Sequence, residues 1–243
     1  MKEEIYIFDD KQALAKQLAD DFKKAADNLQ DGGKLTVALS GGSTPRSFFR
    51  FLAQEPYLNT IDWNRINFYW GDERCVPPDN VQSNFKMAND EFLSKININH
   101  ENIHRVFGEN PPPEEAKRYE REIIDNLGTS DNGFPRFDWI MLGMGEDGHT
   151  ASLFPGASTL DEKQRICVVA THPQSGQKRI SLTLPVLDNA KRVSFLVAGE
   201  SKIKVLTDII GNRSSNLPYP SSMVHPVDGS LEWYLDKAAA TNL

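Results

Sequence analysis

The sequence has little cysteine, no long hydrophobic run and no excess of positive charge, and each shortage excludes a class of protein. Two cysteines in 243 residues, Cys75 and Cys167, are too few for a disulfide scaffold and have no metal-binding spacing. The charged residues 1–5 contain no apolar signal core, so we expect a cytoplasmic protein that is neither exported nor membrane-anchored. The net charge of −7 repels polyanions, which argues against nucleic acid or an anionic membrane as a partner.

Interdomain linkers are also missing. The chain has no low-complexity segment or charged block, and its only proline cluster, residues 111–113, directly precedes a helical pattern. We interpret that cluster as a rigid helix entry rather than a hinge. The length could hold one large α/β domain or two small ones, and nothing in the sequence forces a split.

Short apolar runs of strand length alternate with amphipathic, helix-like segments. The runs predict strands at residues 4–8, 35–39, 66–70, 137–142, 165–169, 179–182, 193–198 and 229–236. The amphipathic segments predict helices after the capping pair Asp9-Asp10, at 47–52, 84–92 and 114–127, from about residue 200, and in the alanine-rich tail. Residues 171–176 are predicted to form a mobile loop.

Three of these strands end in loops that combine glycine with polar or charged side chains. The loops are Ser-Gly-Gly-Ser-Thr-Pro-Arg at 40–46, Gly-Asp-Glu-Arg at 71–74 and Gly-Met-Gly-Glu-Asp-Gly-His at 143–149. In a parallel sheet such strand ends lie along one edge, where α/β proteins bind ligands. The recurrence therefore predicts a site built from all three loops.

The loop at 40–46 suits an anion. Its glycines and hydroxyls stand before a helical run, so that backbone N–H groups stay free at a helix N-terminus, and Arg46 adds a positive charge. The loop lacks the Gly-Lys-Ser/Thr of a Walker motif and the Gly-x-Ser-x-Gly of a nucleophile elbow, so Ser40 is not proposed as a nucleophile. A plain strand-to-helix turn is the alternative.

The loop at 143–149 satisfies the dinucleotide fingerprint Gly-x-Gly-x-x-Gly by its letters. The context argues against a nucleotide site. Pro155-Gly156 would interrupt the helix that must follow this fingerprint, and the carboxylates of Glu146 and Asp147 would repel a pyrophosphate. Two interpretations remain, a functional loop that carries Asp147 and His149 and a tight surface turn.

Two further basic residues have a functional and an ordinary interpretation. Arg74 offers a planar fork for phosphate or carboxylate, yet residues 72–74 also fit a solvated charged turn. Lys202 lies in a first helical turn, against the dipole preference for acids there, which a bound anion would explain. A surface lysine is the alternative.

Together, the segments 39–45, 71–74 with Ser83-Asn84, 143–156, 179–183 and 198–202 resemble the family of glucosamine-6-phosphate isomerases and 6-phosphogluconolactonases. The resemblance spans nearly all of the chain. His-Thr-Ala-Ser-Leu-Phe-Pro at 149–155 is the lactonase form, whereas the isomerase form continues with Ile-Ala-Phe-Asn-Glu-Pro. Residues 217–222 depart from the family pattern, and no ligand contact is assigned to them.

The resemblance implies that residues 1–243 form a single α/β domain with a doubly wound, mostly parallel sheet and helices on both faces. It also implies hydrolysis of a phosphorylated sugar lactone, 6-phospho-D-glucono-1,5-lactone, in the oxidative pentose phosphate pathway. His149 would be the general base and Asp147 its acidic partner. The substrate-binding residues expected on this basis are Gly41, Gly42, Ser43, Thr44, Arg46, Asp72, Arg74, Ser83, Asn84, Gly145, Arg179 and Lys202.

Lactone opening needs an activated water, a stabilised oxyanion and a proton for the departing ring oxygen. A neutral imidazole can take the proton from water and return it as an acid, so one histidine serves both steps. Backbone amides around Gly41, Gly42 or Gly145 are expected to supply the oxyanion contacts. We expect no cofactor and no metal. The other four histidines do not converge on His149 by sequence, and the asparagine-rich stretch around His100 and His104 is not helical enough for a zinc pair.

Two other functions stay open at this point. One is isomerisation and deamination of an amino-sugar phosphate. The other is sugar-phosphate sensing without catalysis, although sensors of this architecture normally carry a basic DNA-binding module that the sequence does not show. We expect a monomer.

Overall fold

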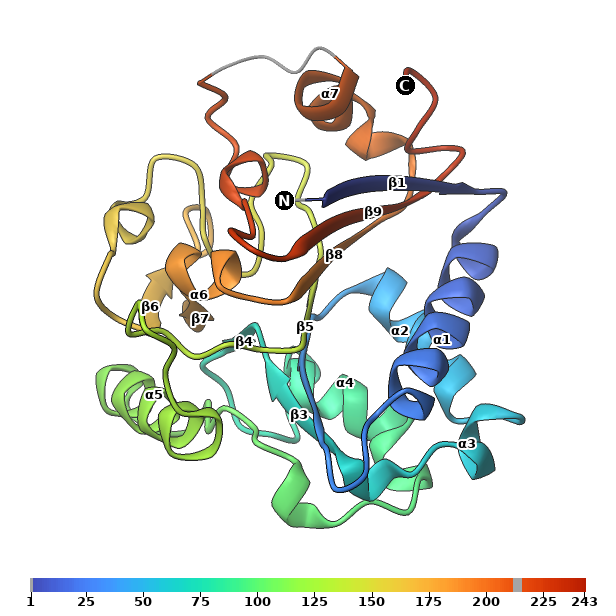
Figure 1. The fold of residues 1–243 in the computed structure, drawn as a ribbon. Coiled ribbons are helices and arrows are strands. Elements are labelled where there is room, and N and C mark those ends of the chain that lie inside the picture. Colours follow the sequence, from blue (N-terminus) through green and yellow to red (C-terminus); the bar gives the residue numbers. More distant parts are fainter. Residues whose placement is uncertain (1, 212–215) are drawn as a thin grey trace.

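The computed structural model describes residues 2–211 and 216–243. In this part of the chain a six-stranded parallel sheet forms the centre of the molecule, with the strand order β1-β9-β8-β5-β2-β3 (Figure 1). Its strands are β1 (Lys2–Phe8), β2 (Leu35–Leu39), β3 (Ile66–Trp70), β5 (Trp139–Leu142), β8 (Arg192–Val197) and β9 (Ser230–Asp236). The mostly parallel sheet predicted from the sequence is therefore confirmed.

A second sheet lies beside the first. It has three antiparallel strands in the order β4-β7-β6, with β4 (Asp72–Arg74), β6 (Cys167–Thr171) and β7 (Lys178–Leu182). The expected strand at 165–169 thus begins and ends two residues later. A single sheet was predicted, and the second sheet was missed. The alternation of polar and apolar residues identifies a strand, but it does not show which sheet the strand joins.

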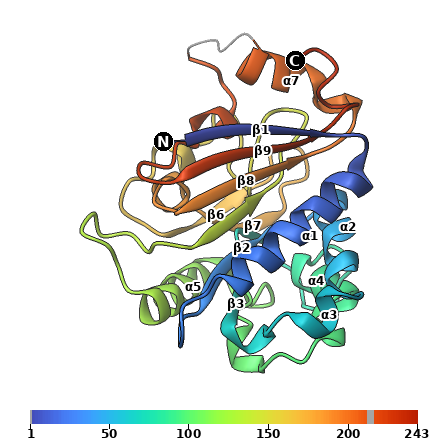
Figure 2. The ribbon, with the colours of Figure 1, turned by 45° about the vertical axis from the view of Figure 1, so that its right-hand side comes forward.

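The helices of the described residues are α1 (Lys11–Asp27), α2 (Ser43–Leu52), α3 (Tyr57–Thr60), α4 (Asn84–Glu91), α5 (Pro112–Leu127), α6 (Leu184–Asp188) and α7 (Ile203–Leu206). Figures 1 and 2 show α1 and α2 against one face of the main sheet, while α5, α6 and the small sheet lie on the other side. None of the helices in residues 2–211 and 216–243 is long and apolar enough to cross a membrane.

The core on the α1 side is aromatic. Phe22 of α1 stacks on Phe68 of β3 with ring centroids 6.1 Å apart and meets the edge of Phe48 of α2 at 5.7 Å. All three side chains are fully buried. The residues at the strand exits are therefore held on a close-packed layer, which fixes their positions.

Helix starts follow local rules, with one correction. Asp10 caps α1 as predicted, because its carboxylate accepts hydrogen bonds from the amides of Gln12 and Ala13, both at 2.8 Å. Helix α2 begins at Ser43 and not at residue 47. Pro45 is tolerated inside the first turn because the first four amides of a helix have no partner within it.

The C-terminal strand is present as expected, but the alanine-rich tail that follows it forms turns instead of a helix. Asp236 explains the difference. Its carboxylate accepts from the amide of Ala239 at 2.8 Å and also from the amide of Gly199 at 2.9 Å, which holds the chain in a tight turn at the end of β9.

Asp188, at the end of α6, gives a prediction for stability. Burial raises the pKa of its carboxyl from 3.8 to about 6, although the amide of His225 donates to it at 2.6 Å. A raised carboxyl pKa means that this group stabilises the fold fully below pH 3.8 and that the contribution is lost as the pH rises through about 6. Asp188→Asn should therefore stabilise the protein at neutral pH by about 1–2 kcal/mol, a figure discounted for partial exposure, and have little effect near pH 4.

Urea unfolding at both pH values measures this difference. Asp161→Asn is the control, since Asp161 is exposed. An Asp188→Asn variant that is equally destabilised at both pH values would contradict the prediction.

Candidate active site

The carboxyl ends of β2, β3 and β5 meet at one edge of the main sheet, because β2 pairs with both of the other strands. A pocket of about 190 Å³ lies at this edge. Its lining residues are Ser40, Gly41, Gly42, Asp72, Arg74, Asn84, Gly143, Met144, Gly145, His149, Ala151 and Arg179. The three loops singled out in the sequence thus form one site, joined by β7 through Arg179.

His149 and Asp147 form a hydrogen-bonded pair in this site. Nδ1 of His149 lies 2.6 Å from Oδ1 of Asp147, which also accepts from the amide of His149 at 3.1 Å. Burial by itself would raise the pKa of Asp147, but these hydrogen bonds outweigh it and lower the pKa. An ionised Asp147 requires the ring proton on Nδ1, which leaves the lone pair of Nε2 free to act as a base.

The backbone of the loop fixes this pair. The amide of Gly145 donates to the carbonyl oxygen of His149 at 2.9 Å, and the amide of Gly148 donates to the carbonyl oxygen of Gly145 at 3.1 Å. This corrects one expectation, because the Gly145 N–H already has an acceptor and cannot also serve an oxyanion. In the described part of the chain the amides of Gly41 and Gly42 have no acceptor.

Gly145 gives a steric prediction with a matched control. A Cβ at Gly145 would come within 2.1 Å of Nδ1 of His149 and 2.5 Å of Oδ1 of Asp147, whereas a Cβ at Gly143 meets only Oγ of Ser40, at 3.6 Å. Gly145→Ala should therefore displace the His–Asp pair and lower kcat by about 10-fold or more, since a shift of about 1 Å in a catalytic group is costly. Gly143→Ala should retain most of the activity. Equal kcat values for the two variants would contradict this account.

Helix α2 points its N-terminus at the pocket. Its N-cap, Gly42, has a φ of 108°, and no side chain caps the helix. Gly41 packs so closely on Asn84 that a Cβ there would lie 2.0 Å from the amide oxygen Oδ1. The open amides of this helix end suit a phosphate or an oxyanion. Thr44 is buried and Ser43 exposed, and neither side chain lines the pocket.

Two arginines, Arg74 and Arg179, also line the pocket. Arg74 donates from Nη1 to the carbonyl oxygen of Gln82 at 2.6 Å, and the Nε atoms of Arg74 and Arg179 are buried without a hydrogen-bond partner in the described residues. Burial lowers the pKa of Arg179, the charge of Arg74 acts in the same direction, and Asp72 partly offsets both. An anion bound between the two guanidinium groups would supply the missing partners.

Acidic residues hold the arginine side in place. Asp72 accepts from the hydroxyl of Ser152 at 2.7 Å, and Nη1 of Arg179 donates to the same hydroxyl at 3.4 Å. Glu73 is buried and accepts four hydrogen bonds, including those from the amides of Asn84 and Phe85 at the start of α4. Ser152 and Glu73 were not predicted as residues of the site. Both lie in segments that carry the family resemblance, 71–74 and 143–156. Their role in holding the arginine side of the site is visible only from their burial and hydrogen bonds.

Several expected binding residues lie outside the pocket lining. Arg46 is directed to Glu91, with Nη1 and Oε1 3.7 Å apart, and Ser83 donates to Glu73 at 3.0 Å while capping α4. Lys202 is half-buried and close enough to the loop at 143–149 to interact with the charges of Glu146 and Asp147. Burial lowers its pKa, and the carboxylates of Glu146 and Asp147 act against that shift.

His172 lies near His149 in the fold, which its position in the sequence did not indicate. The ring of Phe154 contacts both imidazoles, with its centroid 4.9 Å from that of His149 and 5.2 Å from that of His172. The hairpin between β6 and β7 carries His172 back to the site. Sequence distance could not reveal this, because the small sheet had not been predicted.

Residues 217–222 also contact the loop at 143–149. Gly148 has a φ of 78°, and a Cβ there would lie 2.4 Å from the ring of Tyr219. The amide of Ser221 donates to the carbonyl oxygen of Gly148 at 3.0 Å. The hydroxyl of Tyr219 in turn donates to Asp208 at 2.9 Å. This segment therefore packs against the loop and restrains its backbone at Gly148. The sequence had not indicated this contact.

Comparison with known proteins decides the family. The profile described as "Glucosamine-6-phosphate isomerases/6-phosphogluconolactonase" matches residues 9–233, which is most of the chain. The chain belongs to this family.

Relatives within the family are close. The 6-phosphogluconolactonase of Haemophilus influenzae is 47% identical over 203 residues, covering 84% of this chain and 85% of the relative. The crystal structure of a protein named devB has a TM-score of 0.94 at 45% identity, and 99% of each chain is covered. The 6-phosphogluconolactonase of Trypanosoma brucei has a TM-score of 0.88 at 25% identity, covering 100% of this chain and 99% of the other. These relatives confirm the expected enzyme type, and the solved structures confirm the fold class.

Proposed function

We propose that this chain hydrolyses 6-phospho-D-glucono-1,5-lactone to 6-phospho-D-gluconate, as a step of the oxidative pentose phosphate pathway, with His149 as the general base. The observation that carries the proposal is the contact of 2.6 Å between His149 and Asp147 in a pocket that also contains Arg74 and Arg179. A base and a pair of cations in one pocket match a neutral ester carbon and an anionic group on one substrate.

In the proposed reaction, Nε2 of His149 takes a proton from water, and the hydroxide adds to C1 of the lactone. The amides of Gly41 and Gly42 stabilise the oxyanion that forms on the carbonyl oxygen. The bond between C1 and the ring oxygen then breaks, and the imidazolium returns its proton to that oxygen. Asp147 stabilises the imidazolium between the two transfers. The products are a hydroxyl group on the opened sugar and a carboxylic acid, which ionises to the carboxylate by releasing its proton to solvent.

The phosphate end of the substrate requires positive charge. We assign this role to Arg74 and Lys202, with Arg179 as a further candidate. Arg179 and Lys202 both lose hydration on burial, as the lowered pKa values indicate. A dianionic phosphate would compensate for that loss.

The direct test supplies fresh lactone from glucose 6-phosphate and its dehydrogenase and follows 6-phosphogluconate formation with and without the protein. We expect a rate well above spontaneous hydrolysis. A parallel incubation with glucosamine 6-phosphate, assayed for ammonia, tests the deaminase alternative. Stabilisation by 6-phosphogluconate without any turnover would reject the enzyme and favour a sensor.

A further inference from the structure

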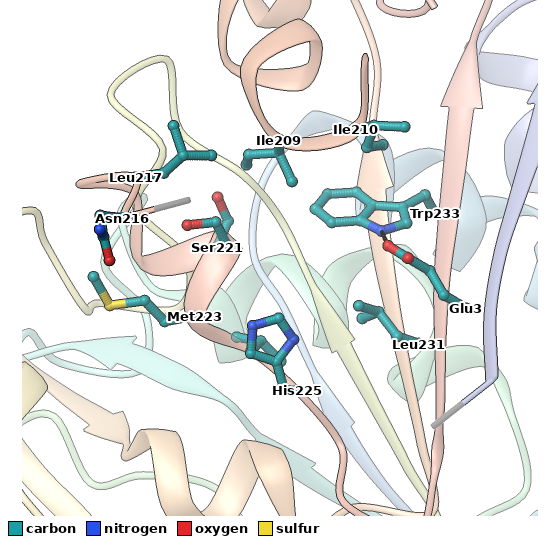
Figure 3. A pocket seen from close by; sticks show the side chains of 12 residues that line it. Glu3, Ile209, Ile210, Asn216, Leu217, Ser221, Met223, His225, Leu231 and Trp233 are labelled. Carbon is teal, nitrogen blue, oxygen red and sulfur yellow. Dashed lines mark hydrogen bonds between the residues drawn. The ribbon is translucent and has the colours of Figure 1, made fainter. Parts of the chain in front are cut away.

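A second and larger pocket, of about 560 Å³, lies away from the active site (Figure 3). Its walls come from β1, β9, the turn at Thr207–Gly211 and the segment that contains Pro220–Met223. The two pockets share no lining residue. A volume of this size is typical of sites for small organic ligands.

The lining of this pocket is chemically unlike that of the active site. Ile209, Ile210, Leu217, Leu231 and Trp233 make much of it apolar. Among the described residues that line it there is no lysine or arginine. The polar side chains among these described residues are Glu3, Asn216, Ser221, Ser222 and His225, and Glu3 is the acidic one.

A carboxylate marks one end of the pocket. Oε1 of Glu3 accepts a hydrogen bond from Nε1 of Trp233 at 3.2 Å, as the dashed line in Figure 3 shows. Glu3 is exposed, and that bond holds its carboxylate beside the apolar side chains of the lining. A carboxylate fixed beside an apolar surface favours a ligand with a positive charge next to a ring.

The opposite wall is connected to the catalytic loop. Ser221 lines the pocket, and its amide is the donor to the carbonyl oxygen of Gly148, at 3.0 Å. Its buried hydroxyl has no partner in the described part of the chain. Gly148 directly precedes His149, so one short segment borders both the second pocket and the base of the first.

We propose that this pocket binds a small aromatic amine, with its ring on the apolar wall and its ammonium group on Glu3. Bound ligand orders the segment around Ser221 and, through the Ser221–Gly148 hydrogen bond, the loop that carries His149. The site is therefore an effector site, coupled to the catalytic loop by a contact of the backbone.

Calorimetry with tryptamine, and with indole-3-acetate as an anionic partner of similar shape, tests the binding. We expect tryptamine to bind at millimolar concentration and indole-3-acetate to bind more weakly. Glu3→Gln should weaken the binding of tryptamine by about three- to tenfold, because the charge-assisted hydrogen bond between its ammonium group and the carboxylate is lost. Glu4→Gln is the matched control, because Glu4 is on the same strand, pairs with Lys2 at 2.9 Å and does not line the pocket.

Ile209→Trp provides a second variant. Ile209 is only partly buried, so that an indole there should fill the pocket without disturbing the core and abolish tryptamine binding. The coupling is read from hydrogen exchange, in which tryptamine should slow the amides of Ser221 and of residues 145–149. This readout does not depend on lactone turnover, so it stays valid if the proposed reaction is wrong.

Absence of tryptamine binding, equal binding of both probes, or binding unchanged in Glu3→Gln and Ile209→Trp would overturn the site. Binding without any change in amide exchange at residues 145–149 would overturn the coupling.

Discussion

Replacing His149 by alanine is expected to lower kcat by about 10²–10⁴-fold while KM changes little. The ring is the only group in the described pocket lining that pairs a free basic nitrogen with an ionised carboxylate, through the 2.6 Å contact with Asp147. Loss of the ring removes both the base for water and the acid for the ring oxygen. Substrate contacts made by the arginines remain, which is why KM should be almost unchanged.

Two companion variants make this result specific. Asp147→Asn keeps the shape of the carboxylate but removes the charge that holds the proton on Nδ1, so kcat should also fall. His100→Ala is the control, because His100 is exposed on the short turn His100–Asn102 and does not line the pocket. Steady-state kinetics, with a thermal melt to check folding, measures all three. A His149→Ala enzyme with a near-normal kcat would remove the proposed mechanism.

Arg74→Ala and Lys202→Ala should act on binding instead, and each should raise KM by about 10- to 100-fold with a smaller effect on kcat. Both side chains lie in sites where burial has removed part of their hydration: Arg74 has a buried Nε without a partner, and burial lowers the pKa of Lys202. An anionic substrate restores the lost interactions, whereas the alanine variants bind it through fewer charged hydrogen bonds.

The control for these variants is Arg50→Ala. Arg50 forms a surface ion pair with Glu91 at 2.9 Å and is outside the pocket, so its loss tests the general effect of removing a positive charge. Inhibition by 6-phosphogluconate gives an independent readout, since product binding should weaken in parallel with KM. If Arg74→Ala and Lys202→Ala lowered kcat alone, the two residues would not be phosphate ligands.

Local sequence signals predicted much of the molecule. The cap at Asp10, the buried strands at 35–39 and 66–70, and the convergence of three strand exits all depend on short-range patterns or on the rule for parallel sheets. The same rule predicted that residues far apart in the chain, such as Gly41 and His149, lie in one site, and both line the pocket.

Features that depend on tertiary contacts could not be predicted in this way. Glu73 looked like part of a solvated turn, but it is buried because four donors from its own strand and α4 surround it. The Gly145 amide looked free, but a backbone hydrogen bond within its own loop occupies it. Arg46 was expected at the anion site, yet Glu91 of α4 draws it away. In each case the hydrogen-bond or ion-pair partner is determined by the folded chain, and the residues adjacent in sequence do not reveal it.

The pairing of β1 with β9 joins the first residues of the described chain to nearly the last, from Lys2 with Ser230 to Phe8 with Asp236. This pairing closes a loop that contains most of the chain, and closing so long a loop has a high entropy cost. We therefore expect β1 and β9 to pair late in folding. During synthesis, β1 has no strand to pair with until β9 has left the ribosome. Its exposed side chains Ile5 and Ile7 could then associate with other nascent chains. Chaperone dependence and the yield of soluble protein should therefore respond to changes in residues 2–8, although none of them lines the pocket that contains His149.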